Sequence, residues 1–459
     1  MPNPTDPASI FGSYDIRGRF PQDFPAATCR RIADALAAVE AGTFVVARDV
    51  RTASARLERA VVGRLNRRAG PTLDLGIQPT PLLGFASSYL GLAGLAFTPS
   101  HNALGYAGVK AFRSNGRMFD REWDRVRTAF SREAPPRPTP SKRTGVRSRS
   151  TGVQSTPAAV LEAYLDHVTR GLTSTRTVVV DGRGGPTTRL APQALARLGV
   201  DVRSLHPGFS ARYHGLSPEP RRDDVAELGR RVREDGADFG IAFDGDGDRV
   251  VFVDEKGRWV EPEAIAWFLY RHLAPAERPW IVSADASERC EARAAVVRVR
   301  VGSRFVSAAM RRHRATVGFE ASSHFYLARW GPNSDGILTA GVVSHFLDDE
   351  GISLGAVSRA FGPIDREQRV LAQSSRAEAR RVFRRLRSSL SAVAERTIDG
   401  YRIRLPAGSV LFRLSNTQPA IRITMEARPG APLSGLRRQW DRLSQSRSDE
   451  VRSPGATSP

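Results

Sequence analysis

One arrangement of hydrophobic and polar positions occurs three times along the chain. An apolar, β-branched run is followed by a short loop of small residues and then by a segment whose apolar positions have helical spacing. The three copies begin at Thr43, Arg176 and Pro279, and the third carries an additional strand-like run before its helix. Strands that alternate with helices form α/β units around parallel or mixed sheets. The pattern therefore predicts three related α/β domains rather than one large sheet.

The last quarter of the chain has a different pattern. A helix-like segment that begins at Ser374 is followed by three strand-like segments, YRIRLP, SVLFRLS and AIRITMEAR, which predict a smaller α+β domain. The stretch 131–157 is rich in Pro, Ser and Arg and is typical of a linker or exposed loop, and the chain is similarly polar from about Ser444. We therefore expect four domains, at residues 1–150, 151–258, 259–366 and 367–459.

Length and composition agree with a chain of several packed domains. Its 459 residues exceed one ordinary domain, and 41% of them are hydrophobic. No apolar run approaches the roughly 18 residues that a membrane-spanning helix needs. The first residues show neither a basic segment nor an apolar core of a secretory signal, and the two cysteines, Cys29 and Cys290, lie too far apart to suggest a disulfide framework. We expect a cytoplasmic protein without a membrane partner.

The charge is strongly positive, at +21 from 69 basic and 48 acidic residues. This excess suits a nucleic-acid partner, but the arginines are spread over helix-like stretches and alternate with acids and alanines. All but three of the basic residues are arginine, a preference typical of a GC-rich genome. The pattern favours solvated helix faces, and nucleic acid is not the expected primary partner. A positive field nevertheless attracts small anionic substrates.

Three aspartates in the sequence FDGDGDRVVFVDEKG carry the clearest chemical signal. Asp244, Asp246 and Asp248 alternate with glycines, and an extended loop with this spacing directs three carboxylates to one side. Oxygen ligands of this kind favour Mg²⁺. A calcium loop would use Glu255 at its twelfth position, but the intervening residues are typical of a buried strand; a plain acidic hairpin is the other alternative. Arg249 directly follows the acids and can contact an anion shared with the metal.

Three further polar clusters follow strand-like runs. Ser100-His101-Asn102 ends the run GLAFT, with Lys110 shortly after it, and this position suits a serine that carries a covalent group. The second cluster is Glu320, Ser322, Ser323 and His324. It suits recognition of sugar hydroxyls, although a capped helix start explains it equally well. The third cluster has the composition of a phosphate cradle and consists of Arg413, Ser415, Asn416 and Thr417, with Arg422 on the following strand.

Together with an N-terminal YDIRG segment at residues 14–18, these motifs resemble the α-D-phosphohexomutase family of phosphomannomutases and phosphoglucomutases. The resemblance covers nearly the whole chain. It implies three α/β domains and a smaller C-terminal α+β domain around a central active-site cleft, in a monomer or dimer. It also implies an enzyme that interconverts hexose 1- and 6-phosphates through a phosphoserine and a hexose 1,6-bisphosphate, which is both intermediate and activator.

The resemblance assigns a role to each candidate residue. Ser100 is the phosphoserine, and it joins the three aspartates at Mg²⁺. Arg17 and Arg249 lie beside the phosphoserine, His101 flanks it, and Lys110 is a general acid/base or an electrostatic support. A lysine with a lowered pKa can release a proton, which arginine cannot readily do. The expected sugar contacts are Glu320, Ser322 and His324, and the expected phosphate contacts are Arg413, Ser415, Asn416, Thr417 and Arg422.

Several positions differ from the family pattern. Ala103 replaces a common proline, Ser323 replaces the usual glycine of the sugar loop, and Gln418 replaces a frequent glutamate. None of these removes the nucleophile or a metal ligand, so we expect an active enzyme. Mannose and glucose phosphates are the leading substrates. Phosphoglucosamine mutases usually carry glutamine where this chain has Ala321, which ranks that activity second. A specialised sugar-phosphate mutase and a non-catalytic anion- or nucleic-acid-binding protein are the remaining alternatives.

Overall fold

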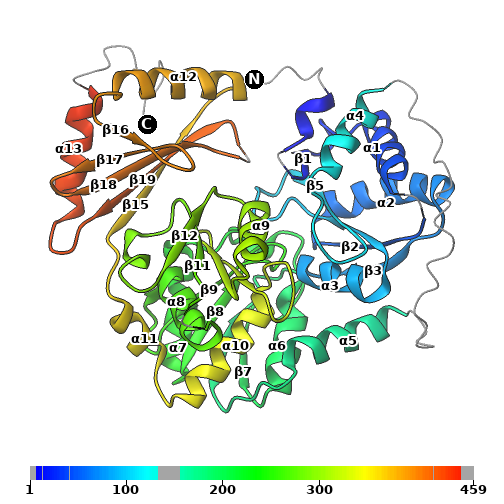
Figure 1. Cartoon of the computed structure of the whole chain (residues 1–459). Helices are drawn as coiled ribbons and strands as arrows, with labels where there is room; N and C mark the ends of the chain where they lie inside the picture. Colours follow the sequence, from blue (N-terminus) through cyan, green and yellow to red (C-terminus); the bar gives the residue numbers. More distant parts are fainter. Residues whose placement is uncertain are drawn as a thin grey trace.

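The computed structural model describes residues 7–12, 14–40, 42–132, 156–275, 277–416 and 418–445. These residues form four sheets with flanking helices (Figure 1). The strand-rich C-terminal part lies at the upper left of Figure 1, and the N-terminal part lies at the upper right. Most of the predicted linker, residues 133–155, lies outside the described residues, as does the polar end from residue 446.

The first sheet has the order β1-β5-β4-β2-β3 and the second has the order β10-β9-β8-β6-β7. The elements of the first domain are β1 (Ile16–Arg19), α1 (Ala26–Val39), β2 (Phe44–Arg48), α2 (Thr52–Arg68), β3 (Leu73–Ile77), α3 (Thr80–Leu90), β4 (Ala93–Phe97), β5 (Tyr106–Phe112) and α4 (Glu122–Ser131). Those of the second are α5 (Pro157–Thr169), β6 (Thr177–Asp181), α6 (Thr187–Arg197), β7 (Asp201–Leu205), α7 (Ala226–Glu234), β8 (Phe239–Phe243), β9 (Val250–Val253) and β10 (Trp259–Val260).

The third sheet has the order β12-β11-β13-β14, and the fourth is an antiparallel sheet in the order β15-β19-β18-β17-β16. The elements of the third domain are α8 (Pro262–Leu273), β11 (Trp280–Ser283), β12 (Val296–Val299), α9 (Ser303–His313), β13 (Val317–Glu320), β14 (His324–Leu327), α10 (Gly336–Asp349) and α11 (Leu354–Phe361). Those of the fourth are β15 (Arg366–Ala372), α12 (Arg376–Ser389), β16 (Ala394–Arg396), β17 (Tyr401–Leu405), β18 (Gly408–Leu414), β19 (Ala420–Ala427) and α13 (Leu433–Gln445).

The first three sheets share one strand connectivity. In each, a central strand pairs in parallel with two neighbours, and the last strand in the repeat returns antiparallel beside the one before it. The three returning hairpins are β4–β5, β8–β9 and β13–β14, and the additional strand predicted in the third copy is β12. The prediction of three related α/β domains followed by a smaller α+β domain is confirmed. The three hairpin connections therefore occupy equivalent positions in the three domains.

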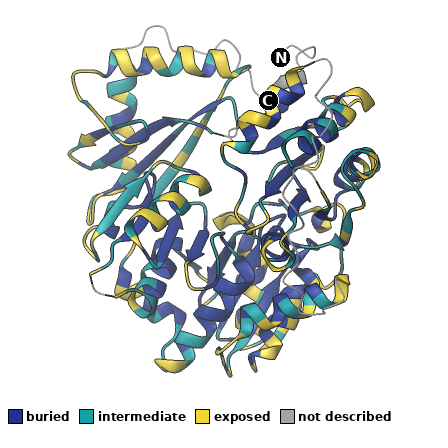
Figure 2. Ribbon diagram, turned by 45° about the vertical axis from the view of Figure 1, so that its right-hand side comes forward, coloured by how far each residue is buried: buried dark blue, intermediate teal, exposed yellow. Residues whose placement is uncertain are grey.

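The buried apolar residues explain why the first three domains form a common support. One cluster is continuous through all three and includes Phe112, Tyr164, Phe243 and Trp280. The fourth domain has a separate cluster around Phe412, on which α12 and α13 pack. Figure 2 shows the strands as mainly buried and the outward faces of the helices as exposed. The site loops of the first three domains are thus built on one shared core, and the fourth domain adds its own.

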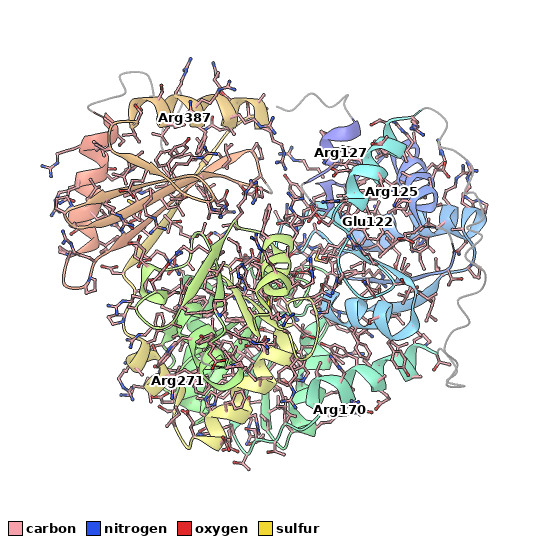
Figure 3. The ribbon with its side chains drawn as sticks, in the orientation of Figure 1. Glu122, Arg125, Arg127, Arg170, Arg271 and Arg387 are labelled. Atoms are coloured by element: carbon pink, nitrogen blue, oxygen red, sulfur yellow. The ribbon has the colours of Figure 1, made fainter. Side chains whose placement is uncertain are left out.

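The surface charge lies largely on outward helix faces, as the sequence pattern predicts. Arg387 on α12 and Arg271 on α8 are exposed and extend away from the ribbon, and so does Arg170 at the end of α5 (Figure 3). Both cysteines are buried and free. Within the described ranges, no helix combines the length and the apolar character that crossing a membrane requires.

Candidate active site

The three equivalent hairpin connections and the β18–β19 turn border one cavity of about 510 Å³. All four domains contribute to its lining, so four motifs that are distant in sequence meet in space. The sequence-predicted residues that line it are Arg17, Ser100, His101, Lys110, Asp248, Arg249, Glu320, Ser322, His324, Arg413, Ser415, Asn416 and Arg422. Asp244 and Asp246 are buried just behind this lining. Thr417 lies outside the described residues.

Ser100 is held in a strained backbone conformation at the end of β4. Its φ of +55° lies in the left-handed region, which costs free energy for a residue with a Cβ and occurs at functional sites that the surroundings over-determine. The Ser100 amide donates to Thr98 Oγ1 at 2.9 Å. The buried guanidinium of Arg51 donates to the carbonyls of Ser100 at 2.7 Å and Ala103 at 2.8 Å. These bonds fix the serine hydroxyl toward the cavity.

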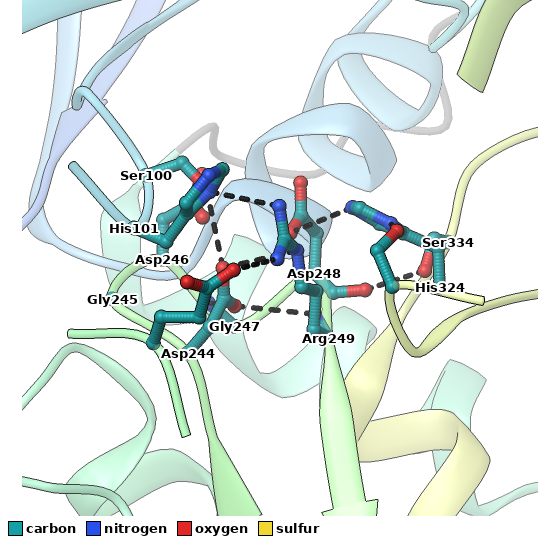
Figure 4. Close-up of polar contacts among 12 residues, drawn as sticks. Ser100, His101, Asp244, Gly245, Asp246, Gly247, Asp248, Arg249, His324 and Ser334 are labelled. Carbon is teal, nitrogen blue, oxygen red and sulfur yellow. Dashed lines mark hydrogen bonds and ion pairs between the residues drawn. The ribbon is translucent and has the colours of Figure 1, made fainter. Parts of the chain in front are cut away.

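The three aspartates follow β8 and converge as predicted. One carboxylate oxygen from each lies within 4.8 Å of the others. Gly247 has a φ of +77°, and a Cβ on Gly245 would lie 2.6 Å from the carbonyl oxygen of Ser100, so the glycines allow both the turn and the close approach of the serine loop. Ser100 Oγ donates to Asp244 Oδ2 at 3.2 Å (Figure 4).

These carboxylates fit a divalent cation. Asp246 Oδ1 is buried and accepts no hydrogen bond from the described residues, which leaves a carboxylate oxygen available inside the triad. The pKa of Asp244 is raised well above its ordinary value by burial and by the charges of Asp248 and Asp246. Repulsion of this kind is relieved by a cation. The calcium-loop alternative fails, because Val250–Val253 is a buried strand and Glu255 accepts instead from the Gly355 amide at 2.9 Å, at the start of α11.

Lys110 reaches the aspartates from β5. Its Nζ lies 2.6 Å from Asp246 Oδ2 and 2.7 Å from Asp248 Oδ2. Burial alone would lower the pKa of Lys110, but the charges of the two aspartates outweigh burial, and the pKa is raised above its ordinary value. Of the two roles expected for Lys110, this arrangement favours electrostatic support over a general acid/base. Lys110 is placed to act as a fixed positive charge.

His101 lies between the serine and Arg249. Arg249 Nη2 donates to His101 Nδ1 at 2.8 Å, and because a guanidinium has no acceptor, Nδ1 must be the unprotonated nitrogen. The pKa of His101 is held well below 6.5 by burial and by the charges of Arg249 and Arg17. Ser100 Oγ is 3.3 Å from the same nitrogen. Arg17 is anchored to the serine loop through the Pro99 carbonyl at 3.0 Å.

The sugar-loop candidates surround the β13–β14 connection. Glu320 is buried, and its two oxygens accept from the Tyr326 hydroxyl at 2.6 Å and the Gly302 amide at 2.8 Å. His324 Nε2 lies 3.3 Å from Asp248 Oδ1, and His324 Nδ1 lies 2.9 Å from Ser322 Oγ. The sugar loop therefore contacts the aspartate loop directly (Figure 4).

Two arginines face each other across the β18–β19 ladder. Arg413 and Arg422 are register partners, and both line the cavity. The pKa of Arg422 is lowered by burial and by the charge of Arg413. Arg413 Nη2 donates to Asp285 Oδ2 at 2.9 Å, and Asn416 Nδ2 donates to the Val301 carbonyl at 2.7 Å. The turn therefore presents guanidinium groups to the cavity while its side chains hold it against the third domain.

Sequence reasoning missed a set of residues that position the site. The Tyr213 hydroxyl accepts from Arg51 Nε at 3.2 Å and donates to the Gly245 carbonyl at 3.1 Å, which joins the serine loop to the aspartate loop. Thr80 Oγ1 donates to Asp246 at 2.5 Å. Alignment of the three repeats would have revealed one signal, because Asp49, Asp181 and Asp285 all lie at or just after the central strand of a repeat. The other missed residues have no local motif.

The fold and the site together define an enzyme class: intramolecular phosphotransferases in which three α/β repeats and a fourth domain enclose a serine, an aspartate triad and arginines. Family models for phosphoglucomutase/phosphomannomutase alpha/beta/alpha domains I, II and III match residues 8–135, 162–257 and 281–361. The chain belongs to the phosphoglucomutase/phosphomannomutase family, within the α-D-phosphohexomutases, and is a mutase.

Relatives cover nearly the whole length of the chain. A probable phosphoglucosamine mutase of Methanopyrus kandleri is 31% identical over 96% of this chain and 99% of its own. A phosphopentomutase of Thermococcus kodakarensis is 31% identical over 91% of this chain and 94% of its own. A solved phosphoglucomutase/phosphomannomutase family structure from Burkholderia thailandensis has a TM-score of 0.80 at 23% identity, covering 98% of this chain and 99% of its own. These matches support one fold but name different sugars.

Proposed function

We propose that the chain interconverts hexose 1-phosphate and hexose 6-phosphate through a phosphoserine at Ser100 and a hexose 1,6-bisphosphate. One observation carries this proposal: a strained serine beside the aspartate triad and a pair of arginines on another domain line the same cavity. The first arrangement suits phosphoryl transfer, and the second suits an anchor for a phosphate that does not react. A sugar that carries a phosphate at either end needs both the transfer site and the anchor.

Different residues of the cavity bind the phosphate, orient the sugar and carry the phosphoryl group. Arg413 and Arg422, with Ser415 and Asn416 nearby, bind the non-reacting phosphate; Thr417 completes this loop in the sequence. Glu320, Ser322 and His324 accept or share hydrogen bonds with sugar hydroxyls and orient the acceptor oxygen toward Ser100. The bond between phosphorus and Ser100 Oγ breaks as the sugar hydroxyl oxygen bonds to phosphorus, and the proton of that hydroxyl ends on Ser100 Oγ. After the bisphosphate turns over in the cavity, its other phosphoryl group returns to Ser100.

The charges around Ser100 suit this transfer. Arg17 and Arg249 are buried beside the serine and offer fixed positive charge where negative charge develops. Neutral His101 flanks the serine hydroxyl, and Lys110 contributes its charge through the aspartates. Asp244, Asp246, Asp248 and Ser100 would hold Mg²⁺, which supplies Lewis-acid neutralisation of the phosphoryl oxygens when bound.

Mannose and glucose phosphates are the leading substrates, because the sugar loop has Ala321 where phosphoglucosamine mutases usually carry glutamine. Glucosamine phosphate is the second candidate, because several of the curated relatives are named probable phosphoglucosamine mutases. Solved structures of an Aspergillus fumigatus N-acetylphosphoglucosamine mutase, with TM-scores of 0.58 and 0.54, contain glucose 1,6-bisphosphate in one case and GlcNAc-6P with magnesium in the other. They support Mg²⁺ and a bisphosphate as the cofactors here. We propose a cytoplasmic enzyme, monomeric or dimeric, whose partners are small sugar phosphates.

A coupled assay tests the proposal. Mannose 1-phosphate, glucose 1-phosphate, glucosamine 1-phosphate and ribose 1-phosphate are compared at equal concentration with Mg²⁺ and a trace of the matching bisphosphate. We expect the highest kcat/KM for mannose or glucose 1-phosphate. A higher value for glucosamine 1-phosphate would select the second candidate, and turnover of the pentose alone would refute the hexose assignment.

A further inference from the structure

A second cavity, of about 480 Å³, lies apart from the active site at the junction of the first and third domains. One wall is the turn 113–118 after β5, and the opposite wall is the C-terminal half of α9 with the segment that follows it. None of its lining residues belongs to the lining of the active-site cavity. Its volume is within the range of small-molecule sites.

Arginines from both domains line this cavity. Arg117 comes from the turn after β5, Arg311 from α9, Arg314 from the turn after α9, and Arg278 from the segment before β11. Arg278 Nη1 donates to the Arg314 carbonyl at 2.5 Å, which ties the two segments together. Four arginines from three segments therefore line one cavity.

The charge of this group is not balanced by nearby acids. Among the described residues, no carboxylate forms an ion pair with Arg117, Arg311 or Arg314, although arginine–carboxylate pairs are frequent elsewhere in the chain. Asp120 interacts electrostatically with Arg311 but forms its ion pair with Arg304, at 3.3 Å. The pKa of Arg311 is lowered by burial and by the charges of Arg117 and Arg113. These guanidinium groups repel one another, and an anion between them would relieve the repulsion.

Other lining groups suit a bound small molecule. Thr316 is among the lining residues, and its hydroxyl oxygen is buried and makes no hydrogen bond to the described residues. Met310, Ala315 and Pro332 add an apolar wall. Arg117, Arg311 and Arg314 are exposed, like the arginines of the outer helices, but unlike those they line a cavity.

We propose that this cavity binds a diphosphate anion, either inorganic pyrophosphate or the diphosphate group of a nucleotide. A planar guanidinium can bind two phosphate oxygens at once, and a diphosphate has enough oxygens to engage several arginines. A diphosphate carries about three negative charges near neutral pH, which matches the group of arginines better than a single phosphate does. The proposal does not depend on which sugar the mutase uses.

Isothermal titration with pyrophosphate, ADP and AMP in the absence of Mg²⁺ tests the site. The test variant is R117Q/R311Q, which removes two lining charges. The matched control is R121Q/R312Q, which removes two exposed charges next to the same elements but outside the cavity lining. Mutase activity and melting temperature are measured for both variants, and we expect both to remain as in the wild type because neither pair lines the active site.

We expect wild-type protein to bind pyrophosphate and ADP more tightly than AMP. Each charge-assisted hydrogen bond lost is expected to weaken binding about ten-fold or more. R117Q/R311Q loses at least two of these bonds and should raise the Kd about 100-fold, whereas R121Q/R312Q should change it less than about two-fold. Tighter binding of ADP than pyrophosphate identifies a nucleotide as the ligand, and equal affinity identifies the diphosphate alone. Equal weakening in both variants, unchanged binding in R117Q/R311Q, or no binding to wild-type protein would overturn the proposal.

Discussion

The Tyr213 hydroxyl offers a direct test of how the serine and aspartate loops are held together. Tyr213 is fully buried, and its hydroxyl bridges Arg51, which holds the Ser100 carbonyl, and the Gly245 carbonyl of the aspartate loop. Tyr213→Phe removes only this oxygen. The apolar ring stays, so the substitution separates the bridge from the packing around it.

The size of the effect follows from the two bonds. A buried group left without its partner costs about 1–3 kcal/mol, and a hydrogen bond from a charged donor contributes about 1.5–3 kcal/mol. Arg51 Nε keeps a partial substitute, because Asp49 Oδ2 lies 3.4 Å away. We therefore expect Tyr213→Phe to lower the free energy of unfolding by about 2 kcal/mol. A displacement of about 1 Å in a reacting group can cost about 100-fold in rate, and a smaller shift of Ser100 should lower kcat about ten-fold.

Tyr164→Phe is the matched control. Tyr164 is also buried, and its hydroxyl donates to Asp335 Oδ2 at 2.9 Å, at the start of α10. That end of α10 contacts the aspartate loop through the Gly336 amide, and Asp335 makes no hydrogen bond to the serine loop among the described residues. Urea unfolding should show a comparable loss of stability in both variants, whereas the mutase assay should show a lower kcat only in Tyr213→Phe. Equal kcat values in the two variants would refute the idea that the bridge positions Ser100.

Three further predictions concern single side chains. Ser100→Ala should abolish turnover with the urea midpoint preserved, and substantial residual turnover would mean that Ser100 is not the nucleophile. Asp246→Asn should raise the Mg²⁺ concentration for half-maximal activity about ten-fold or more, because one carboxylate charge is lost beside Lys110; an unchanged Mg²⁺ titration contradicts the metal assignment. Burial and the charge of Asp74 raise the pKa of Glu58 to about 7. The folded state therefore keeps its proton where the unfolded state loses it, and stability falls as pH rises from about 4.5 to about 7. As pH rises through this range, the free energy of unfolding from urea titrations should become larger for Glu58→Gln than for wild type, by up to about 2 kcal/mol. If the free energies of unfolding of the two proteins change in parallel with pH, the raised pKa of Glu58 is refuted.

The repeat pattern was predictable from sequence because strand and helix periodicity are local properties. It identified the three α/β domains, and strand-like runs placed the motifs of Ser100 and Glu320 at strand ends, where the structure has them. The structure also places Asp244 directly after a strand. The sequence alone did not show that the three connections are the same hairpin in three copies. That equivalence explains why motifs far apart along the chain line one cavity.

Interactions between distant segments were beyond sequence reasoning. Lys110 was expected to be a general acid/base or an electrostatic support, and the choice depends on two carboxylate partners that lie 136 and 138 residues further along the chain. The bridge through Arg51 and Tyr213 has the same character, since the two residues are 162 positions apart. Burial is equally non-local: a buried lysine has a lowered or raised pKa according to the acids that surround it, and only the fold decides which acids those are.

In the proposed phosphate anchor, Arg413 has one nitrogen in an ion pair and another without a partner among the described residues. Arg413 is buried, and its Nη2 donates to Asp285 of the third domain. Its Nε is also buried and makes no hydrogen bond to the described residues. Burial would raise the pKa of Asp285, but Arg413 holds it below its ordinary value, so the pair stays charged near neutral pH. Arg422 faces the same guanidinium and repels it. The ion pair thus orients Arg413 beside a cavity that Arg422 also lines, with an excess of positive charge between the two arginines. We therefore expect a phosphate bound there to relieve this repulsion without breaking the contact between the third and fourth domains.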